Sequence, residues 1–170
     1  QLNEIRLDGA RVPVEQRIGA ENEAWGIVAE ALADERHVQF PPQRLRRDLE
    51  EVIDWVRAAG CAGDETVRRT LAELAVEVLE VETLALRVLT AVEQGRPGTV
   101  EAAANKVAGT LLCQKIARAA VELGGPAAIV RGEPVEFLWR QSLWETIGGG
   151  TSEVMRGVVA RHGLGLGGRN

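Results

Sequence analysis

The sequence predicts an all-α domain: an antiparallel four-helix bundle that follows a short β segment at the N-terminus. Three observations carry this prediction. Apolar residues recur at steps of three and four over several long stretches, Gly and Pro separate those stretches, and 45% of the 170 residues are apolar against 26% charged. A chain of this size and balance can bury one core, which excludes disordered and collagen-like proteins and short disulfide scaffolds.

The first segment, residues 4–13, is predicted to form a strand or hairpin. Ile5, Leu7 and Val12 alternate with polar residues around the turn-forming pair Asp8-Gly9. A lone strand cannot complete its own hydrogen bonds, so we expect it at the edge of the domain or in a sheet whose other strands are missing. The first residue is Gln1 rather than Met, which points to a fragment or a processed product.

The first two predicted helices are amphipathic. One runs from about residue 20 to the Pro41-Pro42 stop and carries Trp25, Val28 and Leu32 on one face. The second spans residues 45–59, with apolar side chains on one face and charged side chains on the other.

The third predicted helix, residues 67–92, has the strongest periodicity in the chain. A second apolar row lies beside the first and widens the face that we expect to be buried; it consists of Val76, Leu79, Thr83, Leu86 and Leu89. The fourth helix, residues 99–123, contains small residues that allow close helix approach. An irregular aromatic stretch, a glycine turn and a short helix to about residue 161 complete the chain.

The charge and the cysteine and histidine content limit the classes of partner and site that we expect. The chain has 20 basic and 25 acidic residues, a net charge of −5, so we expect neither nucleic acid nor an anionic membrane surface as a partner. Cys61 and Cys113 match neither a zinc spacing nor a disulfide framework, and we interpret both as small apolar residues in a reducing cytoplasm. Neither His37 nor His162 has another possible metal ligand at a spacing typical of metal-binding motifs, so no metal site is predicted.

The tail, residues 147–156, is the first candidate site. Three glycines, Gly148 to Gly150, let the backbone approach a ligand closely, and Thr151 or Ser152 can cap the following helix. This combination suits a phosphate or the carbonyl edge of a ring cofactor. A plain glycine turn before a capped helix explains the same pattern.

The second candidate is Glu35. It lies three residues after Leu32 and seven after Val28, so helical geometry places its carboxylate on or beside the apolar face. Desolvation there raises the proton affinity of a carboxylate, which suits a general base. The alternative is a structural ion pair with Arg36 or another cation.

Taken together, these segments resemble the C-terminal part of an acyl-CoA dehydrogenase over essentially the whole chain. The passage 11–26 looks like the link from the middle β-domain into the bundle, and Glu122-Leu123-Gly124-Gly125 looks like the family's Leu-Gly-Gly turn. The run Gly150-Thr151-Ser152-Glu153 is similar to its Gly-Thr-Ser-Glu signature. The resemblance therefore divides the chain into residues 1–19, the end of the β-domain with its linker, and residues 20–170, the bundle.

The resemblance implies a flavoenzyme that binds FAD in the full-length protein and oxidises an acyl-CoA to the trans-2-enoyl-CoA. It implies electron transfer to an electron-transfer flavoprotein and a homo- or hetero-oligomer, either a dimer or a tetramer. Gly150, Thr151, Glu153, Gly124 and Gly125 would then contact the cofactor.

The resemblance also implies a carboxylate base that removes the α proton of the substrate. The place of this base in the sequence differs between members of the family. In many members it precedes the Gly-Thr of the tail, a place held here by Gly149, which would instead line the substrate site. In others it lies on the first bundle helix directly before an Arg, which matches Glu35 with Arg36 as an orienting or substrate-contacting residue.

Three functions remain open on the sequence. The first is the catalytic bundle of an FAD-dependent acyl-CoA dehydrogenase. The second is a non-catalytic structural subunit of a heteromeric complex, favoured by Gly149 and by Val121, which replaces a frequent Gln. The third is a four-helix partner-binding module unrelated to flavin. The acyl group is not specified, since steroid side chains, branched acids and straight chains all fit.

Overall fold

The computed structural model describes residues 3–28, 31–32 and 41–167. The chain divides into two units, residues 1–32 and residues 33–170, which are considered separately. The predicted boundary between residues 19 and 20 stays a prediction.

The described residues of the first unit form no strand, so the expected β segment is absent from residues 3–28. They contain a 3-10 turn, η1 (Val14–Gln16), and helical residues at 24–28 and 31–32. All of them are exposed, including Ile5 and Trp25, whose exposed fractions are 83% and 78%. A strand needs a neighbour to accept its hydrogen bonds, and the described part of the chain offers residues 4–13 none.

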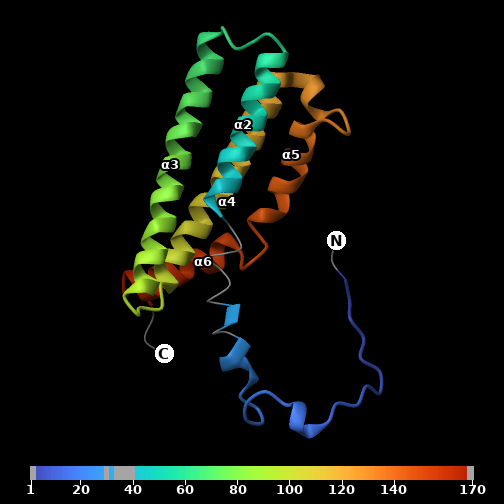
Figure 1. Ribbon diagram of the computed structural model, residues 1–170, viewed down its shortest axis with the longest axis vertical. Helices are drawn as coiled ribbons and strands as arrows, with labels where there is room; N and C mark the ends of the chain where they lie inside the picture. Colours follow the sequence, from blue (N-terminus) through green and yellow to red (C-terminus); the bar gives the residue numbers. More distant parts are fainter. Residues whose placement is uncertain (1–2, 29–30, 33–40, 168–170) are drawn as a thin grey trace. The chain divides into compact units, whose positions relative to one another are not determined.

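The second unit is a bundle of four helices (Figure 1). These are α2 (Pro42–Ala58), α3 (Glu65–Glu93), α4 (Thr99–Gly124) and α5 (Pro134–Glu145). A 3-10 turn, η2 (Gly125–Ile129), joins α4 to α5. The short helix α6 (Ser152–Val158) and a π-helical turn, η3 (Val159–Gly163), lie across the end of the bundle where α4 begins.

The ends of the helices follow local chemistry. Helix α2 starts at Pro42, three residues before the predicted start, because proline fits the first helical position, where no N–H partner is needed. Helix α3 starts after Asp64, whose carboxylate accepts hydrogen bonds from the N–H groups of Thr66 and Val67. Gly95 and Gly98, both with positive φ, form the turn between α3 and α4.

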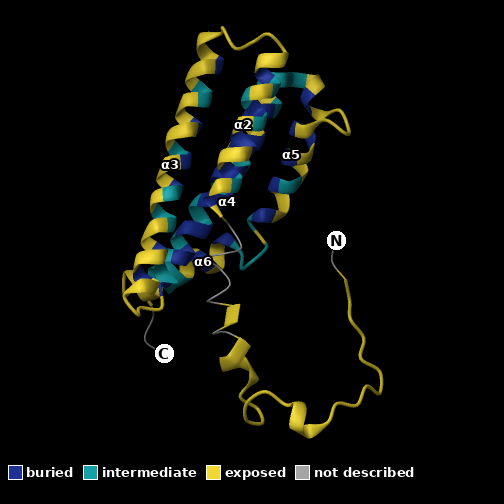
Figure 2. Ribbon diagram, viewed as in Figure 1, coloured by how far each residue is buried: buried dark blue, intermediate teal, exposed yellow. Residues whose placement is uncertain are grey.

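Helix α4 is the centre of the bundle, since it packs on α2, α3, α5 and α6. In Figure 2 the visible part of α4 is coloured mainly buried or intermediate. Gly109 lies where three helices meet: a Cβ built at that position would be in ordinary contact with Val81 of α3 at 3.6 Å and with Leu45 of α2 at 3.7 Å. The predicted close approach through small residues of this helix is confirmed, with Gly109, Ala117 and Ala120 buried.

Two expectations about the helices were wrong. The second apolar row of α3 is exposed rather than buried: Leu79 and Leu86 have exposed fractions of 55% and 62%. Helix α3 meets α2 and α4 on one side only, so its other side has no neighbour within the described chain. The stretch expected to be irregular forms helix α5, which begins at Pro134.

Within the described residues, no helix is both long enough and apolar enough to cross a membrane.

Candidate functional site

The tail motif forms a loop, residues 146–151, between α5 and α6, which we call the glycine loop. The N–H groups of Ile147 and Gly148 donate to the carbonyl of Trp144 at 2.9 and 3.0 Å, which ends α5 in a tight turn. Gly149 and Gly150 then adopt positive φ values of 66° and 96°. Side chains rarely take such backbone angles, so these two glycines set the path of the loop.

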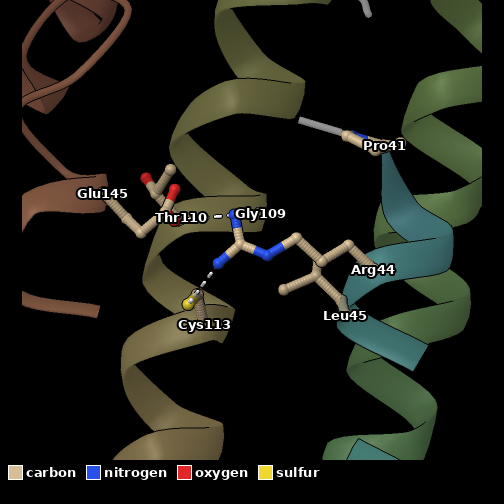
Figure 3. A pocket seen from close by; sticks show the side chains of 7 residues that line it. All are labelled: Pro41, Arg44, Leu45, Gly109, Thr110, Cys113 and Glu145. Atoms are coloured by element: carbon tan, nitrogen blue, oxygen red, sulfur yellow. Dashed lines mark hydrogen bonds and ion pairs between the residues drawn. The ribbon is translucent and has the colours of Figure 1, made fainter. Parts of the chain in front are cut away.

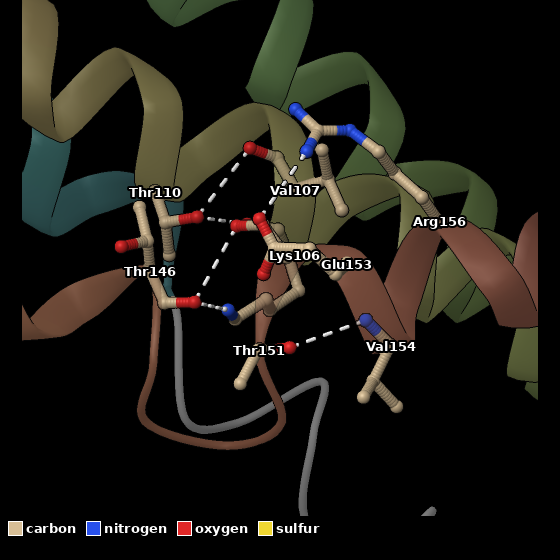
Figure 4. Close-up of polar contacts among 9 residues, drawn as sticks. Lys106, Val107, Thr110, Thr146, Thr151, Glu153, Val154 and Arg156 are labelled. Atoms are coloured by element: carbon tan, nitrogen blue, oxygen red, sulfur yellow. Dashed lines mark hydrogen bonds and ion pairs between the residues drawn. The ribbon is translucent and has the colours of Figure 1, made fainter.

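The carbonyl oxygen of Thr146 joins the two ends of the glycine loop (Figure 4). It accepts a hydrogen bond from the N–H of Ser152 at 2.9 Å and from the Nζ of Lys106 at 3.2 Å. The hydroxyl of Ser152 lies 3.5 Å from the same oxygen. One backbone carbonyl thus connects the start of the loop, the first residue of α6 and a lysine of the central helix.

Lys106 is buried under this loop, with an exposed fraction of 1%. Burial lowers the pKa of its ammonium group, and the nearby carboxylates of Glu145 and Glu153 act in the opposite direction. The charge is therefore desolvated but faces two acidic groups.

Thr151 and Glu153 occupy the far end of the glycine loop. The hydroxyl of Thr151 accepts a hydrogen bond from the N–H of Val154 at 3.2 Å and caps α6. The Glu153 side chain is exposed, and hydrogen bonds from its own N–H and from Thr151 lower the pKa of its carboxyl group. Glu153 is therefore a carboxylate at neutral pH and suits the acceptance of hydrogen bonds rather than the storage of a proton.

The glycine loop has unused hydrogen-bond donors. Among the described residues, the N–H groups of Gly149, Gly150 and Thr151 donate to no backbone or side-chain acceptor, although all three residues are only partly exposed. Backbone donors in this state are suited to a ligand oxygen or ring nitrogen.

A second buried polar cluster lies between α2, α4 and α5 (Figure 3). The Nη1 of Arg44 is 2.6 Å from Oε1 of Glu145, and its Nη2 is 3.9 Å from the sulfur of Cys113. Asp48, one turn along α2, lies 3.6 Å from Nε of Arg44. Arg44 thus connects the first turn of α2 to the last residue of α5, directly before the glycine loop.

The cavity beside this cluster holds about 20 Å³, the space of roughly one water molecule, so it is not a substrate pocket. Burial raises the pKa of the Cys113 thiol to about 12, which makes it a poor nucleophile. Cys113 is buried as expected, whereas Cys61 is exposed. Cys113 is therefore not a candidate nucleophile.

The predicted site residues do not form one cluster. Gly124 and Gly125 lie at the C-terminal end of α4, whereas Lys106 and the glycine loop lie near its start. At about 1.5 Å per residue this is a separation of roughly 27 Å. Gly124 packs on the indole of Trp55, since a Cβ there would lie 1.9 Å from that ring. Glu35 and Arg36 lie outside the described residues.

Sequence reasoning missed Lys106, Arg44 and Glu145. A signal was present for Lys106, because the residues one helical turn away from it are small or apolar. Arg44 lies in a strongly charged stretch and carried no such signal. No group of three or more His, Cys, Asp or Glu residues suited to a metal ion occurs in the described part of the chain.

Residues 22–164 match the family described as acyl-CoA dehydrogenase, C-terminal domain. The chain belongs to this family, which confirms the resemblance inferred from its motifs.

Individual proteins of this family are similar to the chain over most of its length. The acyl-CoA dehydrogenase FadE26 of Mycobacterium tuberculosis is 34% identical over 92% of this chain and 43% of its own length. FadE29 of the same organism is 32% identical over 95% of this chain and 44% of its own length. The chain therefore spans less than half the length of the curated relatives that it matches.

Solved structures show the same fold. The structure titled "Tcur3481-Tcur3483 steroid ACAD" matches with a TM-score of 0.83 and 30% identity, over 95% of this chain and 44% of that chain. The ChsE4-ChsE5 complex from Mycobacterium tuberculosis matches with a TM-score of 0.78 and 32% identity, over 94% of this chain and 44% of that one. Both titles name two components.

Proposed function

We propose that the protein containing this chain is an FAD-dependent acyl-CoA dehydrogenase, in which this bundle supplies the wall that faces flavin and substrate. The observation that carries the proposal is the glycine loop, whose unused N–H groups lie at the start of a Gly-Thr-Ser-Glu run that resembles the family's signature and falls within the matched residues 22–164. FAD fits this donor set, because a flavin ring presents oxygen and nitrogen acceptors along one edge. When bound, FAD supplies the acceptor for the β hydrogen of the acyl group.

The residues of this chain would have separate roles in binding the cofactor, removing a proton and contacting the substrate. Gly149, Gly150 and Thr151 would hold the flavin through their N–H groups, while Gly124 and Gly125, at the other end of α4, would contact the FAD of a neighbouring subunit. Glu35 would take the α proton of the thioester, and Arg36 would orient that carboxylate or contact the substrate. Gly149, which has no side chain, would leave room for the acyl group.

The relatives support a proposal for the assembly and its partners. Solved relatives titled with two components support a heteromeric dimer or tetramer, and electron-transfer flavoprotein is the proposed electron acceptor. Since one solved relative is called a steroid ACAD, the CoA thioester of a steroid side chain is the first substrate to test, with branched and straight-chain thioesters beside it.

The first experiment is a visible absorption spectrum of the intact protein, purified alone and then with a neighbouring dehydrogenase subunit. We expect a flavin band that acyl-CoA bleaches. Replacement of Glu35 by Gln should keep the band and reduce bleaching by at least 1,000-fold, whereas Glu50→Gln on the exposed side of α2 should behave as wild type. An unchanged rate for Glu35→Gln would remove Glu35 from the mechanism.

The second candidate function is a non-catalytic subunit that supports a catalytic partner. Gly149 favours it, because many family members carry the base at that position. In that case no flavin band appears until the partner is added, and Glu35→Gln leaves the bleaching rate of the pair unchanged.

A further inference from the structure

We propose that Lys106 is a positioning residue for the flavin: its buried ammonium fixes the Thr146 carbonyl and so holds the backbone donors of the glycine loop in place. This role rests on the proposed function, since the loop is taken to contact FAD.

Lys106 makes a polar link between the glycine loop and the centre of the bundle. The bond between Ser152 and Thr146, six residues apart, closes the loop locally. Lys106 comes from α4, 40 residues away along the chain, and reaches the same carbonyl at 3.2 Å. Ser152 and Lys106 are both buried, so the junction is shielded from water.

A loop with three successive glycines needs such a link. Glycine has more backbone freedom than any other residue, and Gly148 to Gly150 offer no side chains that could pack the loop in place. The N–H groups of Gly149 and Gly150 follow within four residues of the Thr146 carbonyl. Fixing that carbonyl to the rigid central helix therefore restricts the directions in which these donors point.

Stability alone does not account for a charge at this position. An apolar side chain of similar volume would fill the same space without the cost of desolvating an ammonium group. The ammonium instead places a positive charge below the loop, offset by Glu145 inside the bundle and by Glu153 at the surface. Such a charge favours electron density on a ligand held by the loop.

The test compares the intact wild-type protein with Lys106→Met and with a matched control, Lys115→Met. Lys115 lies on the same helix, but its ammonium is exposed and paired with Glu77 at 2.6 Å. Three quantities are measured: amide hydrogen exchange over residues 146–152, the dissociation constant of FAD, and the reduction potential of the bound flavin.

For Lys106→Met we expect exchange of the hydrogen-bonded N–H groups of Ile147, Gly148 and Ser152 to rise at least tenfold while the α4 core stays protected. FAD binding should weaken about tenfold and the flavin potential should become more negative. Lys115→Met should match wild type in all three. If Lys106→Met loses helical circular dichroism, Lys106→Gln, which keeps an uncharged donor, replaces it in the same comparison.

Loop exchange in the folded Lys106 variant equal to that of wild type would overturn the proposal. An unchanged flavin affinity and potential alongside faster exchange would overturn the part that concerns the cofactor. A wild-type protein that binds no flavin, alone or with its partner, would instead count against the proposed function, and the exchange comparison would still decide whether Lys106 orders the loop.

Discussion

At Gly150, a single backbone angle determines the path of the glycine loop. Its φ of 96° disfavours any side chain, and a Cβ there would lie 2.7 Å from the terminal methyl of buried Met155. We expect Gly150→Ala to lower the free energy of unfolding by about 1–2 kcal/mol. The control is Gly157→Ala on α6, where a Cβ would meet no atom within 4 Å outside the local helix backbone; this change should stabilise the chain by about 0.5–1 kcal/mol. Urea unfolding measures both, and equal effects would contradict the strain at Gly150.

Asp48 is a carboxyl group of α2 whose pKa depends chiefly on burial. Burial raises the pKa of its carboxyl group above the ordinary value near 3.8, although Arg44 and Arg47 oppose the shift. The folded state therefore binds this proton more tightly than the unfolded state. The stability that the proton contributes is complete below about pH 3.8 and is lost as the pH rises through the folded value.

Asp48→Asn should remove this pH dependence. The free energy of unfolding of the variant relative to wild type should increase as the pH rises from about 3.5 to 6, because only wild type must desolvate a new charge over that range. Urea titrations at a series of pH values measure the difference. A difference that stays constant with pH would show that Asp48 titrates as it does in the unfolded chain.

At the scale of secondary-structure elements, the Arg44–Glu145 ion pair holds α2 to the end of α5. Arg44→Met would leave the Glu145 carboxylate buried without its main partner, at a cost of about 3 kcal/mol of stability. The double variant Arg44→Met, Glu145→Leu should recover part of that loss, because the Glu145 carboxylate is no longer left without its partner. Recovery is incomplete because Asp48 and Lys106 each lose one neighbouring opposite charge.

A double-mutant cycle by chemical denaturation measures this coupling. Losses that simply add in the double variant would mean that the two side chains do not stabilise each other. The exposed pair of Arg57 and Asp54 on α2 serves as the control, and its cycle should give a coupling of less than about 1 kcal/mol.

At the scale of the whole molecule, the exposed apolar row of α3 predicts association. Val76, Leu79, Leu86 and Leu89 lie along one helix with half or more of their surface exposed. Contiguous apolar surface of this kind usually marks an interface. We expect light scattering to give a dimer or tetramer mass, and the double change Leu79→Asp, Leu86→Asp to reduce it. Ile129→Asp, at an equally exposed site on η2, should leave the mass unchanged, and a wild-type mass of one chain would rule out the interface.

Local spacing predicted α2, α3 and α4 to within a few residues, because helix periodicity, capping and proline or glycine punctuation act over one or two turns. It missed α5 because that helix has no single apolar stripe. Val135 and Leu138 face the core together with the polar Ser142 and Glu145, while Phe137 and Trp144 face outward. The glycine loop was recognised from its residues alone, since glycine and a capping threonine have local backbone roles.

The sequence by itself determined the helical class, the order of the long helices, the family and the place of the glycine loop. The tertiary structure alone showed that Lys106 lies beneath that loop, that Arg44 meets Glu145, and that one apolar row of α3 has no partner in the chain. The physical reason is the distance along the chain between the residues that interact. Helix formation depends on neighbours in sequence, whereas the environment of a charge or an apolar row depends on which distant helix comes within a few ångströms of it.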